Sequence, residues 1–149
     1  MYKKIGTVAL ILAVMAGSTL AKKQEETLKQ LAARADSAHA DQQPDLCMQV
    51  AERALKQGSD AYKANQYDQF RINLQQVVTY SDKARSAAMT SKKHVKGTEI
   101  KIRKISERLR DFKLNVNYDD QATVQAAIDK LESFRTDLLK SMFGAKSND

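Results

Sequence analysis

One stripe of mostly apolar residues runs without interruption from Phe70 to Phe112, and it constrains the fold more than any other feature of the sequence. Its members alternate at spacings of four and three residues, which keeps them on one side of an α-helix. They are Phe70, Leu74, Val77, Ser81, Ala84, Ala88, Ser91, Val95, Thr98, Ile102, Ile105, Leu109 and Phe112. The pattern predicts one long helix over residues 66–113, on the order of 70 Å in length. We therefore expect an all-α protein, an elongated antiparallel helical bundle or coiled coil organised on that helix.

Two features could interrupt this long helix. Gly97 lies inside it, where a glycine costs on the order of 1 kcal/mol, and the stretch from Thr90 to His94 is polar. The spacing of the stripe nevertheless stays in step across both features, which a loop of arbitrary length would not preserve. The sequence favours a continuous helix, with a kink at this point as the alternative.

Three more amphipathic segments are expected to fold against the long helix, over residues 22–40, 44–63 and 120–143. Pro44 suits the first position of a helix, because its missing N–H is not needed there. Gly144 suits the position after a helix end. With 149 residues, the chain is long enough for one modest core. We expect a single helical domain over residues 22–144 and a flexible polar tail over 145–149.

Short connections predict antiparallel packing on both halves of the long helix. Counting outward from the turn at Asn65 pairs Val77 with Ala54, and counting outward from the turn after residue 113 pairs Ile105 with Leu131. The first helix is expected to complete a three-helix bundle at one end. The other end would then be a two-helix coil.

The segment over residues 55–77 resembles one tetratricopeptide-repeat hairpin. The residues that carry the resemblance are Leu55, Gly58, Ala61, Tyr62, Asn65, Tyr67, Phe70, Leu74 and Val77. The resemblance implies that a small residue near Gly58 admits the partner helix. Phe70 departs from the pattern, since the family usually has a small residue there, and no second copy follows at the family period of about 34 residues. An ordinary αα-hairpin explains the same spacing.

The first 21 residues have the pattern of a secretory signal peptide. Lys3 and Lys4 precede an apolar run over residues 5–17, and small residues lead to Ala21. The run is shorter than the roughly 20 residues that a membrane-spanning helix needs. We expect export, cleavage near Ala21 and a periplasmic or secreted mature protein, with an uncleaved anchor as the alternative.

Basic residues concentrate in the second half of the long helix. Nine Lys or Arg residues lie between Lys92 and Lys113 against three acidic residues, in a chain of net charge +7. The candidate anion- or partner-binding residues are Lys96, Lys101, Arg103, Lys104, Arg108 and Arg110. Such a stripe attracts polyanions. Because an exported protein seldom meets nucleic acid, the expected partner is an anionic envelope component or a protein, and a merely solvated helix face is the alternative.

Cys47 is the only cysteine, so it cannot form a disulfide within the chain. Helix periodicity turns it inward beside Leu46 and Val50, and free cysteine is among the most buried residue types. Burial is therefore expected. A reactive thiol that links two copies through an intermolecular disulfide is the alternative.

The sequence shows no pattern of catalytic or metal-binding residues. His39 and His94 are far apart, and the chain has no Glu-x-x-His pair, no Cys-x-x-Cys-His motif and no glycine-rich phosphate loop. We expect no enzyme activity, no cofactor and no small-molecule substrate.

These observations favour an exported, non-enzymatic interaction or scaffold protein. A chaperone-like holdase for unfolded exported clients is the second interpretation, since the chain resembles the basic periplasmic chaperones in size, charge and helicity. A small enzyme or redox carrier is the third. Ile100, Leu114 and Leu139 lie off the main stripe, so a second contact surface for a client or for self-association into a homo-oligomer also stays open.

Overall fold

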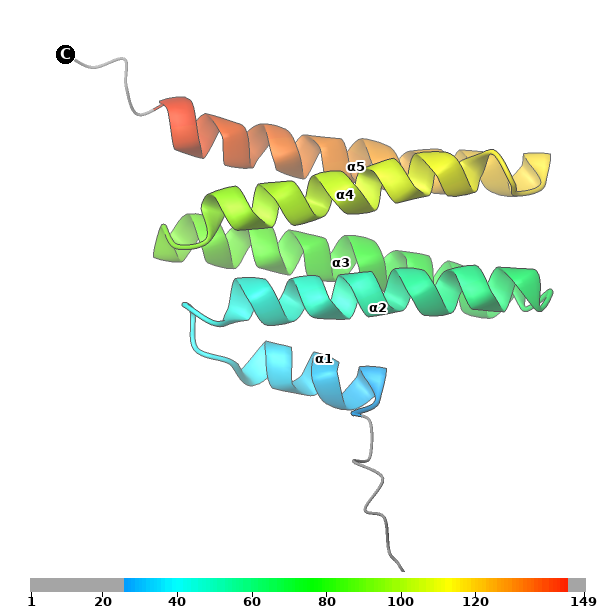
Figure 1. The fold of residues 1–149 in the computed structure, drawn as a ribbon, viewed down its shortest axis with the longest axis horizontal. Helices are drawn as coiled ribbons and strands as arrows, with labels where there is room; N and C mark the ends of the chain where they lie inside the picture. Colours follow the sequence, from blue (N-terminus) through cyan, green and yellow to red (C-terminus); the bar gives the residue numbers. More distant parts are fainter. Residues whose placement is uncertain (1–25, 145–149) are drawn as a thin grey trace, which may run out of the picture.

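The computed structural model describes residues 26–144, which form helices and turns without a strand (Figure 1). The helices are α1 (Leu28–Ser37), α2 (Gln43–Lys63), α3 (Tyr67–Ser91), α4 (Val95–Lys113) and α5 (Tyr118–Phe143). Each helix runs antiparallel to the one before it. The predicted all-α class is therefore confirmed. The predicted signal peptide and the C-terminal tail lie outside the described residues.

The prediction of one long helix over residues 66–113 is wrong. α3 ends at Ser91, α4 begins at Val95, and the chain reverses its direction between them (Figure 1). Lys92 and His94 both have left-handed backbones, with φ of 55° and 61°, and this conformation ends a helix instead of continuing it. The break lies in the polar stretch and not at Gly97, which belongs to the first turn of α4.

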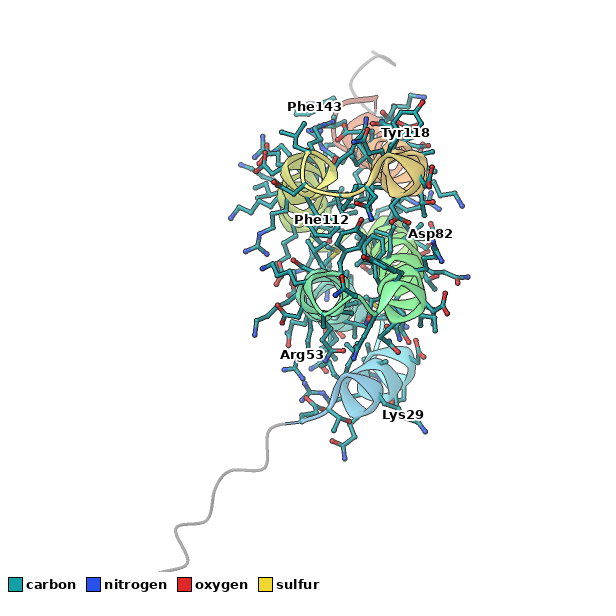
Figure 2. The ribbon with its side chains drawn as sticks, turned by 90° about the vertical axis from the view of Figure 1, so that its right-hand side faces the viewer. Lys29, Arg53, Asp82, Phe112, Tyr118 and Phe143 are labelled. Atoms are coloured by element: carbon teal, nitrogen blue, oxygen red, sulfur yellow. The ribbon has the colours of Figure 1, made fainter. Side chains whose placement is uncertain are left out.

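This reversal changes the architecture, because α4 and α5 do not extend away from the other helices as a two-helix coil. Viewed end-on in Figure 2, α2 and α3 form one layer, α4 and α5 form a second layer on top of it, and α1 covers the opposite side. α4 packs mainly on α5, and the two layers meet where α4 contacts α2 and α5 contacts α3. The fold is a helical bundle of two stacked hairpins with one additional helix.

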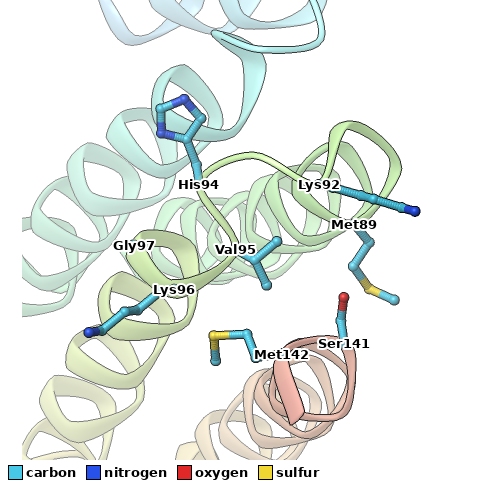
Figure 3. A pocket seen from close by; sticks show the side chains of 8 residues that line it. All are labelled: Met89, Lys92, His94, Val95, Lys96, Gly97, Ser141 and Met142. Carbon is cyan, nitrogen blue, oxygen red and sulfur yellow. The ribbon is translucent and has the colours of Figure 1, made fainter. Parts of the chain in front are cut away.

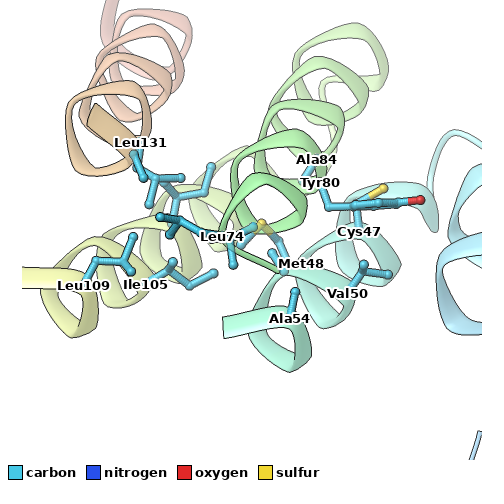
Figure 4. Close-up of a cluster of buried hydrophobic side chains, with 14 of the residues drawn as sticks. Cys47, Met48, Val50, Ala54, Leu74, Tyr80, Ala84, Ile105, Leu109 and Leu131 are labelled. Carbon is cyan, nitrogen blue, oxygen red and sulfur yellow. The ribbon is translucent and has the colours of Figure 1, made fainter. Parts of the chain in front are cut away.

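The core runs through all the layers. Leu31 of α1, Met48 of α2, Val77 of α3, Ile105 of α4 and Leu131 of α5 are each at most 1% exposed. Figure 4 shows part of this cluster, with side chains from both hairpins directed into the same space. Burial of each such side chain stabilises the fold by about 1.5–3 kcal/mol before entropy is counted. One core of buried side chains therefore holds the five helices together.

An aromatic cluster closes the end of the bundle near the turn between α4 and α5. Tyr62 of α2 meets Tyr67 and Phe70 of α3 and Phe112 of α4 edge to face, with ring centroids 5.0–5.5 Å apart. The Tyr62 hydroxyl donates to Asp120 at 3.1 Å and accepts from a backbone N–H at 2.7 Å. The cluster joins the two layers.

The predicted antiparallel registers agree with contacts between the helices. A Cβ atom added at Gly58 would lie 3.1 Å from Cβ of Asn73, four residues along each helix from the predicted pair of Ala54 and Val77. α2 and α3 therefore approach closely at this glycine. Between α4 and α5, the Ser106 hydroxyl donates to Glu132 at 2.5 Å, one residue from the predicted pair of Ile105 and Leu131.

The predicted helix bounds are close for α2 and α5 and less so for α1. α1 begins after a capping box formed by Thr27 and Gln30, and it ends at Ser37, three residues before the predicted end. Pro44 lies in the first turn of α2, one residue after the helix begins at Gln43, whereas the prediction placed it at the first position. None of the helices in residues 26–144 combines the length and the apolar composition that crossing a membrane requires.

Candidate functional site

The exposed side of α4 carries most of the candidate anion-binding residues. Its opposite side is fixed in the core by Ile102, Ile105 and Leu109, all at most 1% exposed. Because residues three, four and seven apart share one side of a helix, the remaining side must face solvent. The exposed candidates on that side without a partner in the described part of the chain are Lys96, Arg103, Lys104 and Arg108, and we call them the basic face.

Lys101 and Arg110 do not belong to this face. Lys101 donates to Asp45 of α2 at 2.8 Å, and Arg110 donates to Glu132 of α5 at 2.9 Å. Both residues use their charge to attach α4 to its neighbours. The six candidates that the sequence grouped together therefore divide into four exposed cations and two structural ion pairs.

Within residues 26–144, none of the four side chains of the basic face forms an ion pair or a hydrogen bond. The face spans the thirteen residues from Lys96 to Arg108, or about 18 Å along the helix axis. Glu107 is exposed among them, so the face keeps a net charge of +3. Exposed cations without partners remain free to interact with an external anion.

The basic face borders the contacts that α4 makes with its two neighbours. Lys104 and Arg108 lie three and seven residues after Lys101, which reaches α2, so they lie on the α2 side of the helix. Arg103 lies seven residues before Arg110, which reaches α5, so it lies on the other side. The cations of the basic face are therefore distributed across the exposed width of α4 and do not form one tight cluster.

A groove of ≈ 920 Å³ lies beside Arg108, between α1, α2 and α4. Leu31, Leu55, Tyr62 and Phe112 provide its apolar part. Charges of both signs surround it, from Glu52, Arg53, Lys56, Asp60, Lys63, Arg108 and Asp111. Sequence reasoning missed this groove, because only the reversal after α3 brings Phe112 next to Tyr62.

A nearly buried ion pair holds α4 against α5. Arg135 donates to Glu99 at 2.9 Å and to Glu132 at 2.8 Å, and the Glu99 side chain is only 7% exposed. Burial raises the pKa of Glu132, but the hydrogen bond from Ser106 and the charges of Arg135 and Arg110 outweigh it and hold that pKa below its ordinary value. Glu99 and Glu132 are therefore part of the framework that supports the basic face.

Cys47 is completely buried between α2 and its neighbours, as predicted. Burial, with a smaller effect from Asp36, raises the pKa of the thiol to about 11. A thiol in this environment is neutral at ordinary pH and inaccessible to a second molecule. The alternative of an intermolecular disulfide therefore requires that the packing of α2 open first.

The described residues contain no group of three or more His, Cys, Asp or Glu side chains that could hold a metal ion. His94 lies 3.5 Å from Asp45, and His39 is exposed in the connection between α1 and α2. The prediction that the protein is not an enzyme stays a prediction.

No family model, curated protein or solved structure matches this chain. Any functional conclusion therefore depends on the residues and contacts of the chain itself.

Proposed function

We propose that this protein is an exported, non-enzymatic interaction protein that uses the basic face of α4 to contact an anionic envelope component or an acidic protein partner. The observation that supports the proposal most is the division of the cations of α4. Lys101 and Arg110 are paired with carboxylates of neighbouring helices, whereas Lys96, Arg103, Lys104 and Arg108 have no partner within the described residues. Ion pairs between α4 and its neighbours explain Lys101 and Arg110, but they do not explain the four cations that are unpaired within residues 26–144.

The expected strength of such a contact is moderate. A Lys or Arg near an anionic membrane surface contributes about 1 kcal/mol, and the attraction falls off over a Debye length of about 8 Å at physiological ionic strength. Three or four cations together give an attraction that salt weakens strongly. Binding at low salt and release at higher salt are therefore expected.

The test is a charge-removal variant of the basic face, Arg103→Gln, Lys104→Gln and Arg108→Gln combined. Three lost charges should reduce binding to phosphatidylglycerol vesicles about 100-fold at low salt, on the basis of about 1 kcal/mol for each charge. Co-sedimentation over a series of salt concentrations measures this loss. Circular dichroism should show unchanged helicity, because all three side chains are exposed.

A matched control removes the same net charge elsewhere. Lys29, Lys130 and Lys140 lie on α1 and α5, are exposed, and form no ion pair within residues 26–144. Changing all three to Gln should leave most of the binding intact. Equal losses in both triple variants would show that only net charge matters, and no loss in the basic-face variant would mean that the face is merely solvated.

The groove between α1, α2 and α4 favours a second function, that of a holdase for unfolded exported clients. Its half-buried apolar residues Leu55, Tyr62 and Phe112 could contact apolar client segments. In an assay with an unfolded exported protein, the parent should suppress aggregation and Leu55→Gln should suppress it less. If neither protein affects aggregation, this second function is wrong.

A further inference from the structure

A cleft opens at the end of the bundle where the chain reverses between α3 and α4. It has a volume of ≈ 530 Å³ and is formed by the end of α3, the first turn of α4 and the last turn of α5 (Figure 3). The residues that line it are Met89, Lys92, His94, Val95, Lys96, Gly97, Ser141 and Met142. The cleft exists only because α4 folds back beside α3.

The floor of the cleft is apolar. Met89 and Val95 are half-buried against the core, Met142 is also half-buried, and Figure 3 shows these side chains around the same space between the three helices. Methionine side chains adapt to ligands of irregular shape. Two further apolar side chains on the last turns of α5 are exposed, Leu139 at 37% and Phe143 at 67%.

The rim of the cleft is positively charged. Lys92 and Lys96 extend to opposite sides of it (Figure 3), are exposed, and form no ion pair within the described residues. None of the lining residues is acidic, in contrast to the groove beside α2, which has charges of both signs. His94 points away from the floor toward Asp45, which lies 3.5 Å from it.

We infer that this cleft binds the acyl chain of a single-chain anionic lipid, with the headgroup at the rim, where Lys92 and Lys96 provide positive charge on either side. The apolar floor and the two cations on the rim match the two parts of such a molecule, and the volume lies in the range of about 300–1,000 Å³ that is common for small-molecule sites. An anionic polysaccharide would use the two lysines and leave the floor exposed. The inference rests on the proposed function, because Lys96 also belongs to the basic face, and it names an amphiphile as the ligand class.

Alkyl phosphates of increasing chain length test the inference. They are titrated into the full mature chain below their micelle concentrations, and isothermal calorimetry gives each affinity. Because each buried methylene contributes a fixed transfer free energy, the affinity should rise about fourfold for each added carbon until the floor is covered. Inorganic phosphate alone should bind too weakly to detect.

Two groups of variants separate the floor from the rim. Met142→Gln should remove most of the dependence on chain length, and Met89→Gln serves the same purpose if the first variant loses helicity. Lys92→Gln and Lys96→Gln should each weaken every alkyl phosphate about fivefold at low salt, whatever its length. Leu114→Gln is the matched control, since Leu114 is 82% exposed at the opposite end of the bundle, and it should change nothing.

Two results would overturn the inference: affinity that does not depend on chain length, or binding of the neutral octyl glucoside as tight as that of octyl phosphate. The basic-face variant Arg103→Gln, Lys104→Gln and Arg108→Gln should still bind alkyl phosphates. If vesicle binding depends on the basic face but alkyl phosphates show no chain-length dependence, only the cleft assignment fails. If alkyl phosphates bind as expected but vesicle binding ignores the basic face, only the proposed function fails.

Discussion

Replacing Lys92 by glycine should stabilise the protein, because the backbone at this residue is left-handed, with φ 55° and ψ 19°. A non-glycine residue in this conformation costs about 1–2 kcal/mol, whereas the greater freedom that glycine gives the unfolded chain costs about 0.5–1 kcal/mol. The Lys92 side chain is exposed and forms no ion pair within residues 26–144. The free energy of unfolding should therefore rise by about 0.5–1 kcal/mol.

The same substitution would destabilise the protein if residue 92 lay inside one continuous helix. There, glycine in place of lysine would lower the free energy of unfolding by about 1 kcal/mol. Lys104→Gly provides the matched control, because Lys104 is an exposed lysine in the interior of α4. This variant should lose about 1 kcal/mol of stability, so the two lysine-to-glycine changes should move stability in opposite directions.

Urea unfolding followed by far-ultraviolet circular dichroism measures both variants. The slope against denaturant should be the same as for the parent, so that a shift of the midpoint reports stability alone. If Lys92→Gly is as destabilising as Lys104→Gly, residue 92 is helical. The reversal between α3 and α4, and the cleft that depends on it, would then be wrong.

Three further predictions follow from burial and charge. Cys47 is 0% exposed and its pKa is raised to about 11, so a thiol reagent should label it only after denaturant is added. Rapid labelling of the native protein would contradict its burial. Folding lowers the pKa of Glu132 below its ordinary value of 4.5. The stability that the ionised Glu132 contributes is therefore present above pH 4.5 and is lost as the pH falls through the lower pKa of the folded state. In the Glu132→Gln variant, the free energy of unfolding should depend less on pH in this range. Ile105→Ala should lower the free energy of unfolding by about 2–5 kcal/mol, and Ile100→Ala, at a half-buried position, should lower it much less. Equal shifts of the melting temperature would show that the inward side of α4 is misassigned.

The sequence predicted α2 and α5 well, because each is bounded by local signals. Pro44 marks the beginning of α2, and Gly144 directly follows the end of α5. The pairing of these helices with α3 and α4 was also predictable, since a short turn leaves little freedom in the register of an antiparallel pair. Local sequence signals were therefore sufficient to predict the helix pairing and register within each hairpin.

The reversal at Lys92 was not predictable from the apolar stripe. In a bundle, both helices of a hairpin direct their stripes at the same core, and the turn between Ser91 and Val95 has a length that keeps the spacing of four and three in step. Periodicity reports which side of a helix is buried and contains no information about the direction of the chain. The polar stretch before Val95 was the available signal, and the unbroken spacing outweighed it.

The division of the basic residues was equally hidden from the sequence. Lys101 and Arg103 differ by two positions, yet only Lys101 reaches a carboxylate, that of Asp45 on α2. That contact depends on the layer of α4 and α5 lying over α2, which follows from the reversal. Local spacing can identify a charged stripe, whereas the partners of its members lie far along the chain, 56 positions away for Lys101 and 22 for Arg110.

The succession of antiparallel neighbours also determines how the chain can fold. The most extensive packing joins helices that follow each other directly in sequence, α2 with α3 and α4 with α5. Each hairpin can therefore assemble from residues close in the chain before the two layers meet, and only that final docking closes a long loop. Topologies dominated by such local pairs reach the native state within about microseconds to milliseconds, which leaves little time for the apolar sides of the hairpins to meet those of another molecule.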